Sequence, residues 1–210
     1  MAIEVSLLHR TRYRYDKEVA LGPQVIQLRP TPHCRTPILN YSLDVTPGDR
    51  ILNWSLDAHA NYLARVLFPT RTTEFSVEVN LVADMTPYNP FAFFLEPGVD
   101  TYPFSYSPEL SKDLEPYRRA DLKDAAGPRF SAFVKSVSRE TQGTVAFLGG
   151  LNESVRKAVG YEMRLEHGVQ SCEQTLELGT GSCRDSAWLL VELCRQLGFA
   201  ARFVSGYLIQ

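Results

Sequence analysis

The hydrophobic pattern of this chain changes its period part way along, and this change limits the folds open to it. From residue 3 to residue 81 apolar residues repeatedly alternate with polar ones, most regularly over 73–81, which is typical of half-buried strands. From about residue 118 onward apolar residues recur at spacings of three and four, which is typical of amphipathic helices. The sequence therefore predicts an α+β protein with an all-β first part and a helical second part.

Six segments of the first part have the alternation expected of strands. Turn-forming residues separate several of them, at 30–32, 47–49 and 59–61. Short strands divided by turns at this spacing are typical of antiparallel β-sandwiches. We therefore predict a β-sandwich domain over residues 1–85, with strands at 3–15, 25–29, 39–45, 51–56, 62–68 and 73–81.

Residues 86–117 differ in composition from the segments on either side. They hold six of the thirteen prolines together with a high density of Phe and Tyr. A solvated linker would be poor in aromatic residues. We predict an irregular bridge that packs against one or both of the flanking domains.

The part from 118 to 210 is expected to begin with two helices, at 130–137 behind Pro128 and at about 144–159. The pair Gly149-Gly150 weakens the second helix and could split it. A short extended piece is expected at 161–165 and one helical turn at 174–178. The run at 200–208 is small and apolar, which favours a buried strand, and Arg202 on that strand is expected to pair with a carboxylate.

A glycine-rich turn at 179–181 leads into the most distinctive helix of the chain. Ser182 and Asp185 form an S-x-x-D capping pair, which places Cys183 at the first helical position. The free amides and the positive dipole end of a helix N-terminus stabilise a thiolate, so Cys183 is expected to be reactive. The helix is expected to stop at Gly198, and its apolar face is predicted to consist of Ala187, Leu190, Val191, Cys194 and Leu197.

Two neighbouring motifs around this cysteine carry a resemblance. They are Gly-Thr-Gly-Ser-Cys-Arg-Asp-Ser-Ala at 179–187 and Leu-Gly-Phe-Ala-Ala-Arg-Phe-Val-Ser-Gly-Tyr at 197–207. Together they resemble the transglutaminase-like core of bacterial cysteine proteases, and the β-rich first part resembles the domain that precedes this core. The resemblance implies an antiparallel β-sandwich followed by the helical first part of a papain-like, transglutaminase-like core over 118–210.

In the resembled family the matching cysteine is the nucleophile of a Cys-His-Asp triad, so the resemblance implies this role for Cys183. The family's histidine and aspartate follow the strand that here begins near Ala200. The resemblance thus places both of them beyond Gln210, and we expect the chain to stop inside its catalytic core.

Several residues near Cys183 have both a catalytic and a structural interpretation. Gln170 and Gln174 are possible oxyanion donors, although surface or turn positions are the more common use of glutamine. Gly181 and Ser182 are expected next to the site. Asp185 could serve as the triad acid, but its place in the capping pair is a sufficient structural reason for it.

The four histidines give no clear partner for the thiol. His9, His33 and His59 fall in the predicted β domain, where a structural or surface role is expected. His167 precedes the cysteine, whereas the family's base follows it. Cys172 could have a redox role near Cys183, with an ordinary partly buried thiol as the simpler interpretation.

Composition excludes several classes of function. With 22 basic and 24 acidic residues the net charge is −2, which gives no basic footprint for nucleic acid or for an anionic membrane. No apolar run is long enough to span a bilayer and no signal pattern precedes the first strand, so a cytoplasmic location is expected. Four irregularly spaced cysteines do not form a disulfide scaffold or a metal site, and no cofactor is expected.

Two kinds of function remain open. The first is an enzyme in which Cys183 attacks the amide of a peptide or protein substrate and forms a thioester. Hydrolysis of that thioester, which we favour, gives a peptidase or amidase, whereas capture by an amine gives a crosslinking transglutaminase. The second is a binding or assembly module with a pseudo-enzyme core.

Overall fold

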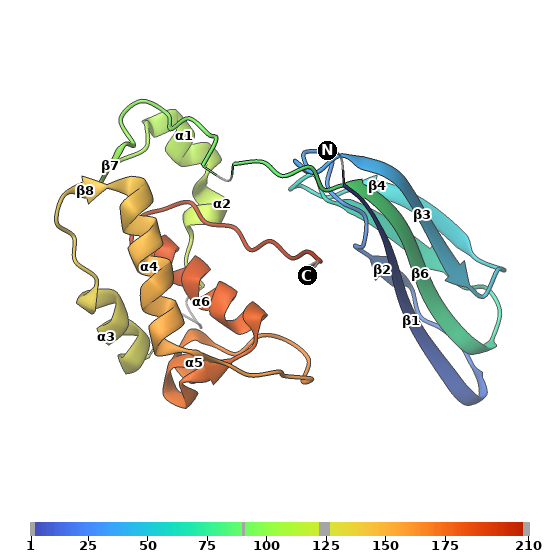
Figure 1. The fold of residues 1–210 in the computed structure, drawn as a ribbon. Coiled ribbons are helices and arrows are strands. Elements are labelled where there is room, and N and C mark those ends of the chain that lie inside the picture. The colour runs from blue at the N-terminus through green and yellow to red at the C-terminus, as the bar shows by residue number, and fades with distance from the viewer. Residues whose placement is uncertain (1–2, 90, 122–126, 208–210) are drawn as a thin grey trace. The chain divides into compact units, whose positions relative to one another are not determined.

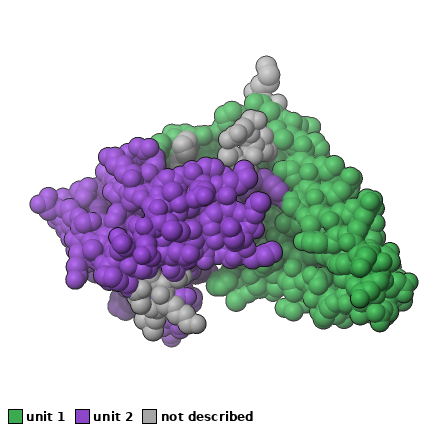
Figure 2. All heavy atoms as spheres, turned by 90° about the horizontal axis from the view of Figure 1, so that it is seen from below, with its two compact units in different colours: residues 1–92 green, residues 93–210 purple. Residues whose placement is uncertain are grey.

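A computed structural model describes residues 3–89, 91–121 and 127–207. The chain forms two compact units, Met1–Ala92 and Phe93–Gln210, which Figure 1 draws as ribbons and Figure 2 colours separately. We refer to them as the β unit and the helical unit. The boundary between them falls inside the predicted 86–117 bridge, while the predicted division into 1–85, 86–117 and 118–210 stays a prediction.

The β unit is an antiparallel sandwich of two three-stranded sheets, as predicted. One sheet has the strand order β1-β6-β3 and the other β2-β5-β4. Side chains from both sheets meet in one buried cluster, which contains Val45, Val77, Ala64 and Val66. The strands are β1 (Glu4–Val19), β2 (Gln24–Ile26), β3 (Ile38–Thr46), β4 (Ile51–Leu56), β5 (Tyr62–Leu67) and β6 (Thr72–Asp84).

The helical unit is built from short helices and two-residue ladders. Its helices are α1 (Pro108–Asp113), α2 (Glu115–Arg118), α3 (Pro128–Ser136), α4 (Thr144–Ala158), α5 (Cys172–Leu178) and α6 (Cys183–Gln196). Strands β7 (Thr101–Tyr102) and β8 (Gln142–Gly143) pair antiparallel, and β9 (Gly160–Tyr161) and β10 (Thr180–Gly181) pair parallel. No helix of the described residues is long and apolar enough to cross a membrane.

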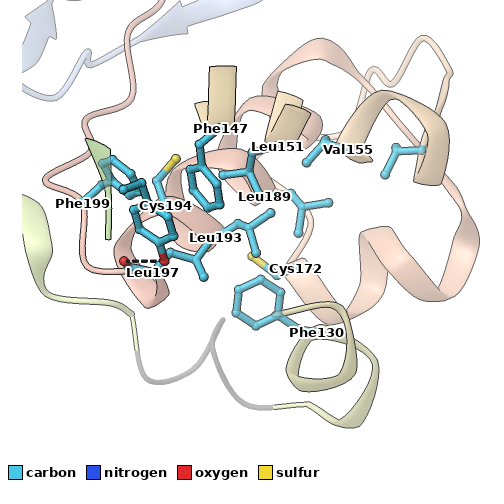
Figure 3. Close-up of a cluster of buried hydrophobic side chains, with 12 residues drawn as sticks. Phe130, Phe147, Leu151, Val155, Cys172, Leu189, Leu193, Cys194, Leu197 and Phe199 are labelled. Carbon is cyan, nitrogen blue, oxygen red and sulfur yellow. Dashed lines mark hydrogen bonds between the residues drawn. The ribbon is translucent and has the colours of Figure 1, made fainter. Parts of the chain in front are cut away.

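One core holds the helical unit together (Figure 3). Phe147 and Leu151 of α4 face Leu189 and Leu193 of α6 in this core. Tyr102 joins it from the predicted bridge: its ring stacks on Phe147 with 3.8 Å between centroids. Part of the proline-rich segment is therefore core structure of this unit.

Helix α4 runs unbroken through Gly149-Gly150, so the possible split does not occur. Each glycine costs a helix about 1 kcal/mol relative to alanine, and burying Phe147, Leu151 and Val155 on the same helix outweighs this cost. Leu148 of the same helix is 36% exposed.

The buried face of α6 is also wider than the predicted one. Leu189 and Leu193 are fully buried, and so is Glu192, whereas Ala187 and Leu190 are only half-buried. The helix contacts α2, α4 and α5, so it is covered on more sides than a surface helix with a single apolar stripe.

The predicted buried strand at 200–208 is wrong for the residues that the structure describes. Residues 200–207 have no strand structure, and Val204 is 77% exposed. Leu208 lies outside the described residues. A strand needs a neighbour to accept and donate its backbone hydrogen bonds; here the amides of Ala200 and Ala201 bind the Tyr106 hydroxyl and the Tyr117 carbonyl instead.

Candidate active site

The turn before α6 presents a single thiol to solvent. Gly179 ends α5 in the left-handed conformation at φ 64°, which suits glycine because it lacks a Cβ. Ser182 is the N-cap of α6, and Cys183 is its first residue, as predicted. The Cys183 side chain is exposed and is not in a disulfide. Sequence and structure therefore agree on a free cysteine at a helix N-terminus.

The cap is organised by one buried carboxylate. Asp185 Oδ2 accepts hydrogen bonds from the Ser182 amide at 2.8 Å and from the Ser182 hydroxyl at 2.6 Å. Its Oδ1 accepts a hydrogen bond from the backbone amide of Gln170 at 2.8 Å. Arg164 Nη1 donates to both carboxylate oxygens, at 2.7 and 2.8 Å. The predicted capping box is present, and Asp185 is fully buried within it.

These contacts determine the charge of Asp185. Burial alone would raise the pKa of its carboxyl group. Hydrogen bonds from Ser182, Gln170 and Arg164 outweigh that effect and hold the pKa well below its ordinary value. A buried carboxylate with a lowered pKa and several partners is charged at neutral pH and suited to fixing the turn, and the structural interpretation of Asp185 accounts for every contact it makes.

A second segment contacts the turn that leads into α6. Residues 160–170 contact it at successive points: the Glu162 amide donates to the Gly181 carbonyl at 2.9 Å, and Glu162 also accepts from the Thr180 hydroxyl at 2.8 Å. Arg184 donates to the Glu166 carbonyl, and Arg164 pairs with Asp185. Nothing in the local sequence marks Arg164 as a partner of a residue twenty-one positions away.

The two glutamines differ in their surroundings. Gln170 is buried, and its Oε1 accepts a hydrogen bond from Thr175 Oγ1 at 3.2 Å. That oxygen also lies 3.1 Å from the place where a Cβ on Gly181 would stand, so Gln170 borders the turn that carries Cys183. Gln174 lies exposed on α5, and among the described residues its side chain makes no hydrogen bond to this network.

Gly181 has a packing reason of its own. A Cβ at this position would stand 3.0 Å from Asp185 Cβ, closer than real Cβ atoms are normally found. The glycine therefore makes room for the buried carboxylate and for Gln170. The expected place of Gly181 next to a catalytic site stays a prediction.

The predictions for Arg202 and for the histidines can be compared with the structure. Arg202 is exposed, so its predicted burial is wrong, because the strand that was to bury it does not form. His167 lies exposed within 160–170, whereas His9, His33 and His59 belong to the β unit.

The remaining thiols differ sharply from Cys183. Cys34 is exposed in the β unit, while Cys172 and Cys194 are buried in the helical unit's core. Burial raises the pKa of the Cys194 thiol to about 11. Within the described ranges, no group of three or more His, Cys, Asp or Glu side chains could hold a metal ion.

The geometry gives Cys183 two features of a nucleophile. Its sulfur is accessible, and the backbone amides of the first helical positions have no acceptor within the helix. No described residue accepts a hydrogen bond from the amides of Cys183 or Arg184. Such amides and the helix dipole stabilise an anion at this place, either a thiolate or an oxyanion formed beside it.

Comparison with known proteins gives the following matches. Residues 5–84 match the bacterial transglutaminase-like N-terminal region, and residues 131–210 match the transglutaminase-like superfamily. The crystal structure of a putative cysteine protease from Cytophaga hutchinsonii is similar, with a TM-score of 0.66 and 16% identity. The similarity covers 94% of this chain and 64% of that one, so this chain spans less than two thirds of that protein's length. A search of curated proteins gave no match.

Proposed function

We propose that Cys183 is the nucleophile of a thiol-dependent hydrolase, because residues 5–84 and 131–210 match the models of the bacterial transglutaminase-like N-terminal region and of the transglutaminase-like superfamily. The substrate is an amide of a peptide or protein. The observation that carries the proposal is the position of Cys183: an exposed thiol at the first residue of α6, after a turn that a buried carboxylate fixes.

The proposed reaction has two steps. The Cys183 thiolate attacks the amide carbonyl, an S–C bond forms, the C–N bond breaks, and the amine leaves with a proton from a general acid. Water then attacks the thioester, which releases a carboxylic acid and returns the thiol. An amine in place of water would give a new amide, which is the transglutaminase alternative.

Two groups of the site are suited to stabilise the oxyanion of both steps. The first is the set of free amides at the start of α6. The second is the Gln170 side chain, since its Oε1 already accepts from Thr175 and, among the described residues, its Nε2 donates no hydrogen bond. Loss of one such donor typically costs two to three orders of magnitude in kcat.

The proton transfers need an imidazole and a group that orients it. Following the resemblance, we place the histidine and aspartate of the triad in sequence that follows Gln210, and this placement is part of the proposal. His167 is the competing candidate within the helical unit. Replacing His167 with Ala in a chain extended beyond Gln210 separates the two: activity is retained under the first assignment and lost under the second.

Thiol reactivity tests the nucleophile without a known substrate. Iodoacetamide labelling at neutral pH, mapped by mass spectrometry, should modify Cys183 about two- to fivefold faster than Cys34, the other exposed thiol. The expected factor follows from roughly 0.3–1 kcal/mol of anion stabilisation at a helix N-terminus. Ser182→Ala, which removes one hydrogen bond to Asp185, should reduce the advantage without abolishing it.

A peptide amide library gives the second test. Cleavage that is lost in Cys183→Ala and retained in Cys34→Ala supports the proposal, and trapping of a Cys183 thioester at acid pH identifies the intermediate. Added lysine methyl ester should leave acid as the main product. A dominant lysine adduct would indicate a transglutaminase, and Cys183 labelling as slow as that of Cys194 would favour the binding-module alternative.

A further inference from the structure

One end of the β-sandwich carries a cluster of aromatic side chains around an arginine. Tyr41 comes from β3, Trp54 from β4 and Tyr62 from β5, so both sheets contribute. The guanidinium carbon of Arg29 lies 5.2, 5.3 and 4.3 Å from the centres of these three rings, respectively. The rings meet edge to face, with 6.2 Å between neighbouring centroids. We call this cluster the Arg29 mouth.

A groove of about 410 Å³ opens at the Arg29 mouth. This volume is within the range of ligand sites. Its lining combines Arg29, aromatic rings and prolines with hydrogen-bonding side chains of Thr31, Thr36 and Asn40, and it contains no Asp or Glu. The lining comes mainly from residues 29–41, inside an acid-free stretch over 19–43, in a chain whose net charge is −2. The groove is thus a locally positive site.

Arg29 differs from other arginines of the same unit. Arg10 and Arg12 each pair with a glutamate of β6, at 2.6 Å. In the described part of the chain, no carboxylate lies within ion-pair distance of Arg29, and its guanidinium makes no hydrogen bond. Contact with the three aromatic rings uses none of its N–H groups as hydrogen-bond donors, so these groups remain for a ligand.

We propose that the Arg29 mouth binds the carboxylate of a peptide. A planar carboxylate accepts two parallel N–H bonds from a guanidinium. One arginine without a competing acid balances one negative charge, which fits a carboxylate better than a doubly charged phosphate. The threonine and asparagine side chains can bind peptide amides, and the rings and prolines can contact apolar side chains. This inference does not depend on the chemistry at Cys183.

Cys34 is a built-in reporter for this site. It lines the groove and is exposed. In the full chain carrying Cys183→Ala, Cys34 is the remaining exposed cysteine, since Cys172 and Cys194 are buried. The rate of Cys34 alkylation then measures occupancy of the groove, and because the nucleophile is absent, the result is independent of the proposed hydrolase.

Three short peptides define the ligand. They are acetyl-Ala-Ala-Leu with a free carboxylate, the same peptide as its C-terminal amide, and acetyl-Ala-Glu-Ala amide. We expect saturable slowing of Cys34 alkylation by one of the two peptides that carry a carboxylate. Slowing by the first identifies a chain terminus as the ligand, and slowing by the third identifies an acidic side chain. The uncharged amide should not slow the reaction. Inorganic phosphate should not compete at equal concentration.

Substitutions of arginine test the contact itself. Arg29→Leu should weaken protection about tenfold or more, because a hydrogen bond to a charged group contributes roughly 1.5–3 kcal/mol. Protection in Arg29→Lys should lie between that of the wild type and that of Arg29→Leu, since lysine keeps the charge and loses the paired N–H geometry. Arg65→Leu is the matched control: Arg65 is also exposed in the β unit and does not line the groove.

Several results would overturn the proposal. They are equal protection by the uncharged amide, protection by phosphate instead of carboxylate, no protection by any peptide, or an effect of Arg65→Leu as large as that of Arg29→Leu. Circular dichroism melting of each variant identifies a folding defect. If Arg29→Leu fails to fold, Arg29→Lys decides, and unchanged peptide affinity in that variant counts against paired recognition by the guanidinium.

Discussion

Replacing Asp185 with asparagine should destabilise the helical unit out of proportion to the small change in shape. The carboxylate is fully buried and accepts from Ser182, Gln170 and Arg164. An asparagine keeps one acceptor oxygen and presents an amide group in place of the other. Whichever way the amide is turned, its nitrogen faces a backbone N–H, either that of Gln170 or that of Ser182.

The magnitude follows from two losses. A buried N–H without an acceptor costs about 1–3 kcal/mol. Arg164, whose side chain is only 15% exposed, also loses its buried countercharge and keeps only the exposed Glu166, 3.6 Å from its Nε; removing one partner of a buried pair costs about 3–5 kcal/mol in total. We expect the free energy of unfolding of the helical unit to fall by about 4 kcal/mol, which corresponds to a shift of about 2 M in the urea midpoint.

The accessibility of the buried thiols measures unfolding of the helical unit alone. Cys172 and Cys194 are buried in its core, so pulse labelling of these two residues against urea reports its unfolding independently of the β unit. Glu153→Gln is the matched control, because Glu153 also pairs with an arginine but does so on the surface of α4. A midpoint for Asp185→Asn no lower than that of Glu153→Gln would refute the reasoning.

The same carboxylate predicts a pH dependence. The pKa of Asp185 is lowered in the folded protein from its ordinary value of 3.8. Its contribution to stability is therefore complete well above pH 3.8 and is lost as the pH falls below that value. The difference in urea midpoint between the wild type and Asp185→Asn should narrow at acid pH; a constant difference would contradict the assignment of charge.

Three further predictions concern the same unit. Cys194, with its pKa raised to about 11 by burial, should react with iodoacetamide only at the rate of unfolding, and labelling in native buffer at the Cys34 rate would contradict this. Gly181→Ala should destabilise the helical unit by about 1–3 kcal/mol, because the new Cβ would stand 3.0 Å from that of Asp185. Gly149 has open space around it, so Gly149→Ala should be neutral or stabilising in the same urea titration. Glu192→Leu should cost about 3–5 kcal/mol, since Glu192 is fully buried and its removal leaves the Arg195 guanidinium without its carboxylate and the Asp121 backbone amide without this acceptor; thermal melting of the far-ultraviolet circular dichroism measures the loss of stability.

Local patterns were sufficient for most of the secondary structure. The alternation that predicted strands over 51–56 and 73–81 is a property of neighbouring residues, and β4 and β6 form there. The capping pair at Ser182 and Asp185 is equally local, so the first residue of α6 could be located from the sequence. These features depend on contacts within a few residues, which is why periodicity and capping rules predict them.

The partners of the site are of another kind. Arg164 and Gln170 reach Asp185 across twenty-one and fifteen residues. Glu173 likewise accepts from the Phe130 amide and so caps α3 from a distance of forty-three residues. No periodic pattern encodes such pairs, because they depend on where separate elements come to lie after packing.

The sequence by itself determined the two kinds of secondary structure, the start of α6 and the choice of Cys183 as the candidate nucleophile, since each depends on residues close together in the chain. The tertiary structure decided which face of α6 is buried, so that Leu189 is fully buried in place of Leu190, and which polar groups hydrogen-bond to the Asp185 carboxylate of the cap. It also decided that residues 200–207 are not a strand: an apolar run becomes a strand only where another strand supplies its hydrogen bonds, and that supply is a property of the assembled fold.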